Sequence, residues 1–308
     1  MATLLDMIDE VSMNLSGYTL QQDRATHITA AVAATASTIA APITLSLAST
    51  DSVGKGIVEI DEELFWVDNY DRVGNTATIA PYGRAYLGTT LATHTEGTKV
   101  TIAPTFPRFT IKRAINDTIN AIGASIFSAK TTTITSNAAV AAFRLPTTGT
   151  TLNISKILSI AYQTLGASKE WTPIRSYRFD GNANSTAFTS GQTVSIYDYI
   201  PSGRTIQIVY ATDPSPFTTN ADVFTTQTGL PESCRDIIIL GATYRLLSNL
   251  DPARASMVSP QADETDSKRP YGSSQSLTRQ VYALFTQRLN EEIKNQQDKY
   301  PIRVHYSL

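Results

Sequence analysis

Apolar residues follow helical spacing in four segments of the chain. Within residues 2–16 they are spaced mostly three and four positions apart, and within residues 106–126 isoleucines step by four, four, three and four. The last third contains two more such segments, one beginning near Pro231 and one ending in NEEIKNQQDK. We therefore predict four amphipathic helices. Their apolar positions are Leu4, Leu5, Ile8, Val11, Met13 and Leu15; Ile111, Ile115, Ile119, Ile122 and Ile126; Ile237, Ile238, Leu240, Tyr244, Leu246, Leu247 and Leu250; and Leu277, Val281, Leu284, Phe285, Leu289 and Ile293.

Between the predicted helices the pattern changes to alternation with a period of two, which is typical of strands. In residues 25–104, GIVEI and LFWVDNY flank an acidic turn, and DRVGN leads into TATIA. Residues 131–220 contain six short candidate strands separated by turn sequences such as DGN, SGQ and PSG. This pattern predicts two β-rich modules, the first a barrel or meander and the second sandwich-like.

The order of these elements predicts an α+β fold. We expect a small helical bundle of about four helices that carries two inserted β-rich modules and an extended C-terminal tail. The expected parts are an N-terminal helix (1–24), a β-module (25–104), a bundle helix (105–130), a second β-module (131–220), two bundle helices with a polar loop at 251–276 (221–299), and a docking tail (300–308).

Composition narrows the function classes. Charged residues make up 17% of the 308-residue chain, below the roughly 25% of typical soluble domains, and the net charge is -2. Binding of duplex DNA through phosphate neutralisation is therefore not expected. The single cysteine, Cys234, excludes an internal disulfide and a cysteine-rich zinc site. We expect no membrane span, because no apolar run approaches the length needed, and no signal peptide, because the N-terminus is acidic.

The segment GRAYLGTTLATHTEGTKV resembles a phosphate-binding loop only at first sight. Gly83 and Gly88 have the spacing of such a loop, but Thr89 stands where a lysine is required, and a strand rather than a helix follows. His94 has no histidine at ligand spacing, so we favour a turn histidine bonded to backbone over a metal ligand or general base. We predict no metal and no cofactor.

Two further clusters allow a functional and a structural interpretation. The acidic turn Asp61-Glu62-Glu63 suits calcium or an acid/base pair, but a solvated hairpin tip is favoured. Four aromatic residues suit a sugar-stacking or partner surface, although cross-strand packing is favoured. They are Trp66, Tyr70, Tyr82 and Tyr86. Since the chain also lacks a GxSxG nucleophile elbow, we predict that it is not an enzyme.

Two segments carry a family resemblance. EIDEELFWVDNYDRVGNTATIAPYGRAYLGTTLATHTEGTKV resembles a module of tailed-phage virion proteins, with an acidic hairpin, an arginine turn, Gly-Thr-Thr, a histidine and a glycine before the last strand. Ala85 stands where that pattern has glycine. The C-terminal layout, from RLLSNLDPAR through a polar loop to RLNEEIKNQQDKYPIRVHYSL, resembles phage head-to-tail adaptor (connector) proteins.

The resemblance implies a structural virion protein at the head-tail junction, assembled in the host cytoplasm. It implies a ring of twelve subunits that binds the portal protein on one side and tail, nozzle or fibre proteins on the other, with DNA passing through the lumen. The portal-docking tail would comprise Tyr300, Pro301, Ile302, Arg303, Val304, His305, Tyr306 and Leu308. Two alternatives remain at this point: a baseplate, collar or fibre protein that binds host-surface glycans, and a hydrolase that uses His94.

Overall fold

The chain forms two compact units. The computed structural model describes residues 2–19, 23–137, 140, 142–145, 154–165, 169–248 and 273–301. One unit comprises residues 5–115 and 239–282, and the other comprises residues 1–4, 116–238 and 283–308. We refer to them as the barrel unit and the sandwich unit, after the sheets that they contain.

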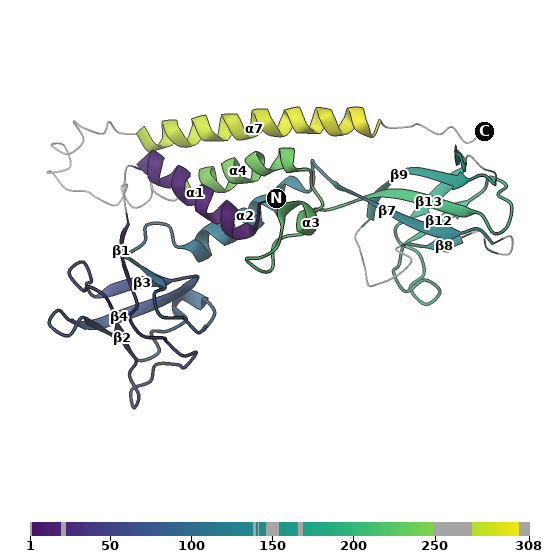
Figure 1. Cartoon of the computed structure of the whole chain (residues 1–308). Coiled ribbons are helices and arrows are strands. Elements are labelled where there is room, and N and C mark those ends of the chain that lie inside the picture. Colours follow the sequence, from purple (N-terminus) through teal and green to yellow (C-terminus); the bar gives the residue numbers. More distant parts are fainter. Residues whose placement is uncertain are drawn as a thin grey trace. The chain divides into compact units, whose positions relative to one another are not determined.

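The barrel unit, in which Figure 1 labels β1 to β4, is built on a six-stranded antiparallel sheet. The strand order is β1-β6-β3-β4-β5-β2. Its two edge strands meet, because Ile28 pairs with Leu47 and the Thr29 amide donates to the Ser46 carbonyl at 2.9 Å. The sheet thereby closes on itself, which removes the exposed edges. The strands are β1 (Arg24–His27), β2 (Thr44–Ser46), β3 (Gly56–Ile60), β4 (Glu63–Asp71), β5 (Thr76–Ile79) and β6 (Lys99–Ile102).

Alternation along the strands sets the inside and the outside of this barrel. In β4, Phe65 and Val67 are fully buried in the core, whereas Trp66 between them lies on the outer face. A register shift between Val67 and Asn69 then reverses the alternation, so that Tyr70 packs against the same core. The core residues are Ile28, Val32, Leu45, Leu47, Val53, Val58, Ile60, Phe65, Val67, Ala77, Ile79, Val100 and Ile102.

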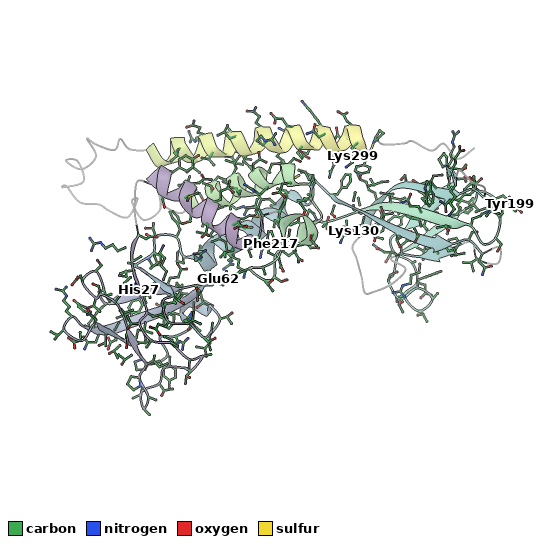
Figure 2. All side chains as sticks on the ribbon, viewed as in Figure 1. His27, Glu62, Lys130, Tyr199, Phe217 and Lys299 are labelled. Carbon is green, nitrogen blue, oxygen red and sulfur yellow. The ribbon has the colours of Figure 1, made fainter. Side chains whose placement is uncertain are left out.

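The sandwich unit contains two sheets, ordered β10-β9-β13-β7 and β11-β12-β8. Both sheets contribute to one core, in which Ile160, Ile206 and Ile208 of the first meet Val194 and Ile196 of the second. Lys130 and Tyr199 mark opposite ends of this β-structure (Figure 2). The strands are β7 (Ser128–Thr135), β8 (Ala142–Arg144), β9 (Ile154–Gln163), β10 (Trp171–Pro173), β11 (Tyr177–Asp180), β12 (Thr193–Ile196) and β13 (Thr205–Thr212).

The predicted apolar stripes match the longer helices unevenly. The five isoleucines from Ile111 to Ile126 are all buried, as predicted. In α1, by contrast, Leu5 and Met13 are 42% and 71% exposed, since the helix turns by about 100° per residue and Met7 takes the inward position. The helices are α1 (Leu4–Thr19), α2 (Arg108–Ile122), α3 (Phe224–Thr228), α4 (Arg235–Ser248) and α7 (Ser273–Lys299), with short 3-10 turns η1 (Tyr86–Gly88) and η2 (Glu232–Cys234). Within the described ranges, no helix is long and apolar enough to cross a membrane.

The prediction of an α+β fold is confirmed, but the prediction of a small helical bundle as its body is wrong. The described residues form thirteen strands in three sheets, against about four substantial helices. Long helical stripes are conspicuous in a sequence, whereas nine of the thirteen strands have only three to five residues and each gives a weak signal, so the sequence pattern overstates the share of the helices. Most of the predicted polar loop at 251–276, and tail residues 302–308, lie outside the described residues.

Candidate functional site

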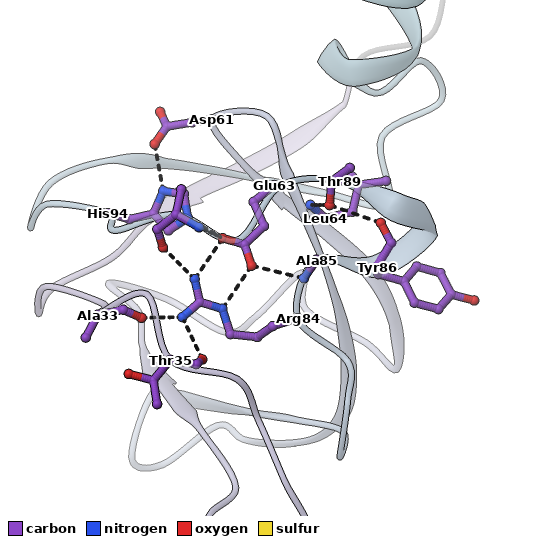
Figure 3. Close-up of polar contacts among 11 residues, drawn as sticks. Ala33, Thr35, Asp61, Glu63, Leu64, Arg84, Ala85, Tyr86, Thr89 and His94 are labelled. Carbon is purple, nitrogen blue, oxygen red and sulfur yellow. Dashed lines mark hydrogen bonds and ion pairs between the residues drawn. The ribbon is translucent and has the colours of Figure 1, made fainter.

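The most unusual cluster of the barrel unit is a buried ion pair between Glu63 and Arg84 (Figure 3). Glu63 begins β4, and Arg84 lies in the segment that follows β5. Arg84 Nε donates to Glu63 Oε1 at 2.9 Å, and its Nη2 donates to Oε2 at 2.7 Å. The two side chains are 1% and 0% exposed, and the guanidinium carbon lies 4.8 Å from the centre of the Phe65 ring. This two-pronged geometry is the strongest form of the Arg-carboxylate contact.

The remaining donors of Arg84 bind main-chain carbonyls of two loops. Nη1 donates to the carbonyls of Ala33 and Thr35, and Nη2 donates to that of Ala92 at 2.7 Å. A buried guanidinium is tolerated only when its donors are satisfied. Arg84 therefore joins the loop after β1 and the loop before β6 to the β3-β4 hairpin.

Glu63 is held ionised by a full set of donors. Besides Arg84, its carboxylate accepts hydrogen bonds from the amides of Ala85 and Ala92, both at 3.0 Å, and from His94 Nε2 at 3.0 Å. Burial by itself raises the pKa of Glu63, but the hydrogen bonds from His94, Arg84, Ala92 and Ala85 outweigh it and lower the pKa to about 2.

His94 completes the network between two carboxylates. Its Nδ1 donates to Asp61 Oδ2 at 2.7 Å, and the ring is 1% exposed. Burial lowers the pKa of His94, but the bonds to Asp61 and Glu63 raise it to about 9, so both ring nitrogens carry protons at neutral pH. We call Asp61, Glu63, Arg84 and His94 the charge network. Its two positive and two negative groups balance.

The charge network corrects two interpretations made from the sequence. His94 is not a turn histidine bonded mainly to backbone, because its ring binds two carboxylates. The acidic turn is solvated only in part: the side chain of Asp61 is 60% exposed and that of Glu62 is 25% exposed, but Glu63 is fully buried. Spacing along the chain did not bring these residues together, although the motif of the resemblance contains all four.

The segment after β5 takes its path because of local backbone geometry. The Cα atom of Gly83 lies so close to the neighbouring backbone that a Cβ atom there would approach the carbonyl oxygens of Ala80 and Trp66 to 2.9 Å. Ala85 and Leu87 have left-handed φ values of 49° and 55°. Alanine in this conformation is strained, which explains why glycine suits the position after the arginine. The hydrogen bond from the Ala85 amide to Glu63 stabilises this left-handed backbone conformation.

Of the four predicted aromatic site residues, the structure brings two together. The rings of Trp66 and Tyr86 lie 5.2 Å apart and are tilted by 44°. Trp66 is 37% exposed, and Tyr82 nearby in sequence is 73% exposed. Tyr70 belongs to the barrel core instead, with the Arg72 guanidinium 5.6 Å from its ring. The surface is therefore an aromatic pair, not a platform of four.

In the sandwich unit, the predicted docking tail begins at an anchored residue. The side chain of Gln296 in α7 accepts from the Phe127 amide at 3.2 Å and donates to the Phe127 carbonyl at 2.5 Å. The ring of Tyr300 lies 5.9 Å from that of Phe127, and its amide donates to the Gln296 carbonyl at 2.9 Å. Pro301 is exposed, and Ile302–Leu308 lie outside the described residues. Tyr300, the first residue of the predicted tail, is thus held beside Phe127 just after the end of α7.

The arrangement offers structural support rather than an accessible reaction centre. The ring of His94 and the carboxylate of Glu63 are shielded from solvent, and each is already bound by charged partners. Among the residues that the structure describes, no group of histidine, cysteine, aspartate and glutamate could hold a metal ion. The network holds the loop after β1 and the loop before β6 rigidly against the β3-β4 hairpin.

Comparison with protein families gives one match. The model of the family described as SU10 adaptor protein matches residues 84–305, which is well over half of the chain. No curated protein matches the chain.

Proposed function

Because this chain belongs to the SU10 adaptor protein family, we propose that it is a structural protein of the phage neck, forming a ring that joins the portal to the tail. The family is one of phage structural adaptors, so the chain is a virion component. The match over residues 84–305 carries the proposal, since it spans nearly all of the sandwich unit and about half of the barrel unit. In this proposal the ring continues the DNA channel without sequence-specific binding of DNA, which accords with the net charge of -2.

The charge network supports a structural role for the barrel. Its charges are matched by partners within the barrel, and two loops and the β3-β4 hairpin converge on one arginine. A protein that must keep its shape within an assembly benefits from such internal ties, because a rigid partner loses little conformational entropy on binding. The family of structural adaptors likewise suggests that the chain is not an enzyme.

The segment after Tyr300 is proposed to dock to the portal. In the sequence IRVHYSL, apolar residues alternate with polar ones, which is the pattern of a strand that can join the sheet edge of another protein. Anchoring through Phe127 and Gln296 would give this strand a defined starting point.

Truncation tests the docking proposal. A chain that ends at Pro301 keeps the anchored Tyr300 and should retain the thermal midpoint of the full chain, but should no longer cosediment with purified portal. The full chain should form a stoichiometric complex whose native mass gives the ring size, expected to be twelve subunits. Undiminished portal binding by the truncated chain would show that the tail is not the docking element.

A second candidate function rests on the aromatic pair of Trp66 and Tyr86, of which Trp66 is exposed. Trp66 and Tyr86 lie side by side at the barrel surface, and exposed aromatic faces stack well on sugar rings. If the protein recognises surface glycans, a glycan array should show binding that is lost in Trp66→Ala. Trp171→Ala, which alters a tryptophan that is 43% exposed in the sandwich unit, is the matched control. An array without any bound glycan would remove this candidate.

A further inference from the structure

A second buried carboxylate of the barrel unit lies outside the charge network. Glu59 is in β3, between the core residues Val58 and Ile60, so alternation places its side chain on the outer face of the barrel. An outer-face glutamate is normally solvated, but Glu59 is only 3% exposed. Another segment must therefore cover the side chain of Glu59, and the hydrogen bonds of Glu59 identify that segment.

The cover is the beginning of α2. The Arg108 amide donates to Glu59 Oε1 at 2.5 Å, and Arg108 is the first residue of this helix. Pro107 precedes it and has no side-chain acceptor that could cap the helix. The first free amide of α2 is therefore satisfied by a carboxylate from the barrel, 49 positions earlier in the sequence.

Other charged groups gather at this junction. Lys112 of α2 binds Glu62 Oε2 at 3.1 Å, and Figure 2 shows Glu62 at the part of the barrel beside α2. Arg108 also binds Asp9 of α1 at 2.6 Å through its guanidinium. Asp23, just before β1, is the remaining charge that acts on Glu59. The register partners of Glu59 on the neighbouring strands, Leu64 and Thr101, are uncharged.

Taken together, the groups around Glu59 destabilise the charged form of its carboxyl group. Burial raises the pKa of Glu59, the amide and guanidinium of Arg108 lower it, and Asp23 and Glu62 raise it again. The result is a pKa of about 7, against 4.5 for an ordinary glutamate.

We propose that Glu59 is a proton-operated latch between the barrel and α2. When its carboxyl group is neutral, Glu59 stays packed against the first turn of α2. When the carboxylate is charged, the contact between Glu59 and this turn opens more often. Glu59 is a positioning residue in this role, because it acts through the helix that it caps.

The sign of the effect follows from linkage. A carboxyl group whose pKa is higher in the closed state than in the open state favours closure below pH 4.5, and this contribution is lost as the pH rises through about 7. With these two pKa values, the opening equilibrium should increase about tenfold between pH 6 and pH 8.

Amide hydrogen exchange in the full chain tests the latch. After correction for the intrinsic pH dependence of exchange, the amides of the first turn of α2 should lose about tenfold in protection between pH 6 and pH 8. Glu59→Gln, which imitates the neutral form, should keep the acid-state protection at both pH values. Glu96→Gln is the matched control, because it alters an exposed glutamate of the barrel unit that is not among the charges acting on Glu59, and it should retain the wild-type pH dependence.

Two outcomes would overturn the proposal. One is an unchanged protection of this turn in the wild type between pH 6 and pH 8. The other is a Glu59→Gln chain that still shows the tenfold change. If this variant does not fold, the carboxyl carbon resonance of Glu59 in the wild-type chain decides, since a titration midpoint near 4.5 contradicts a latch that operates near neutral pH.

Discussion

Arg84 and Glu63, 21 positions apart in the sequence, form a two-pronged ion pair with both side chains almost fully buried. Removing one partner leaves the other charge buried without compensation, which is strongly destabilising. We expect Glu63→Gln to lower the free energy of unfolding by about 3–5 kcal/mol in chemical denaturation. Asp68→Asn, which breaks the exposed pair with Lys55, is the control and should leave stability nearly unchanged. A loss for Glu63→Gln no larger than that of the control would contradict this account.

Because of His94, the free energy of unfolding should fall as the pH rises in the alkaline range. Its pKa is about 9 in the folded chain and 6.5 in an ordinary histidine, so its contribution is fully present below pH 6.5 and is lost as the pH rises through 9. Between pH 7.5 and pH 9.5 the wild type should lose about 2 kcal/mol of unfolding free energy through this group. This pH range lies above the range in which Glu59 is expected to act.

The matched variants are His94→Gln, which should lack this alkaline loss, and His27→Gln at an exposed histidine, which should retain it. Urea denaturation at the two pH values measures the difference. Equal alkaline losses in all three chains would show that His94 is not held as an imidazolium.

Ala85 offers a stabilising substitution. Its φ of 49° is strained for alanine and free for glycine, while the hydrogen bond from its amide to Glu63 does not depend on the side chain. After the entropy cost of glycine in the unfolded chain, Ala85→Gly should raise the unfolding free energy by about 0.5–1 kcal/mol. Ala114→Gly within α2 should lower it by about 1 kcal/mol or more. A decrease for both variants would show that the left-handed geometry at Ala85 is not strained.

Gln296 should control the end of α7. Gln296→Ala removes both hydrogen bonds to the main chain of Phe127, which should lower the unfolding free energy of the sandwich unit by about 1–3 kcal/mol. Exchange of the Phe127 amide should become faster at the same time. Gln297→Ala, at the exposed neighbouring position, is the control. Unchanged exchange at Phe127 in Gln296→Ala would mean that the side chain does not anchor this segment.

The charge network shows how far the candidate site could be predicted. The resembling motif contains Asp61, Glu63, Arg84 and His94, but their spacing fits no ligand or catalytic pattern, so the sequence does not connect them. Tyr70 illustrates the same limit: simple alternation places it with Trp66, and only the register shift after Val67 moves it into the core. Such irregularities depend on the partner strand, which the local sequence does not specify.

The sequence by itself determined the α+β class, the positions of the four longer helices and of most strands, and the buried isoleucine stripe of α2, because periodicity is a relation between near neighbours. The tertiary structure decided that β-sheets and not a helical bundle dominate, that the first sheet closes on itself, and that Glu63 and Glu59 are buried. Whether a carboxylate is solvated or buried depends on residues brought beside it from distant parts of the chain. For Glu63 these are Arg84 and His94, and for Glu59 it is the first turn of α2.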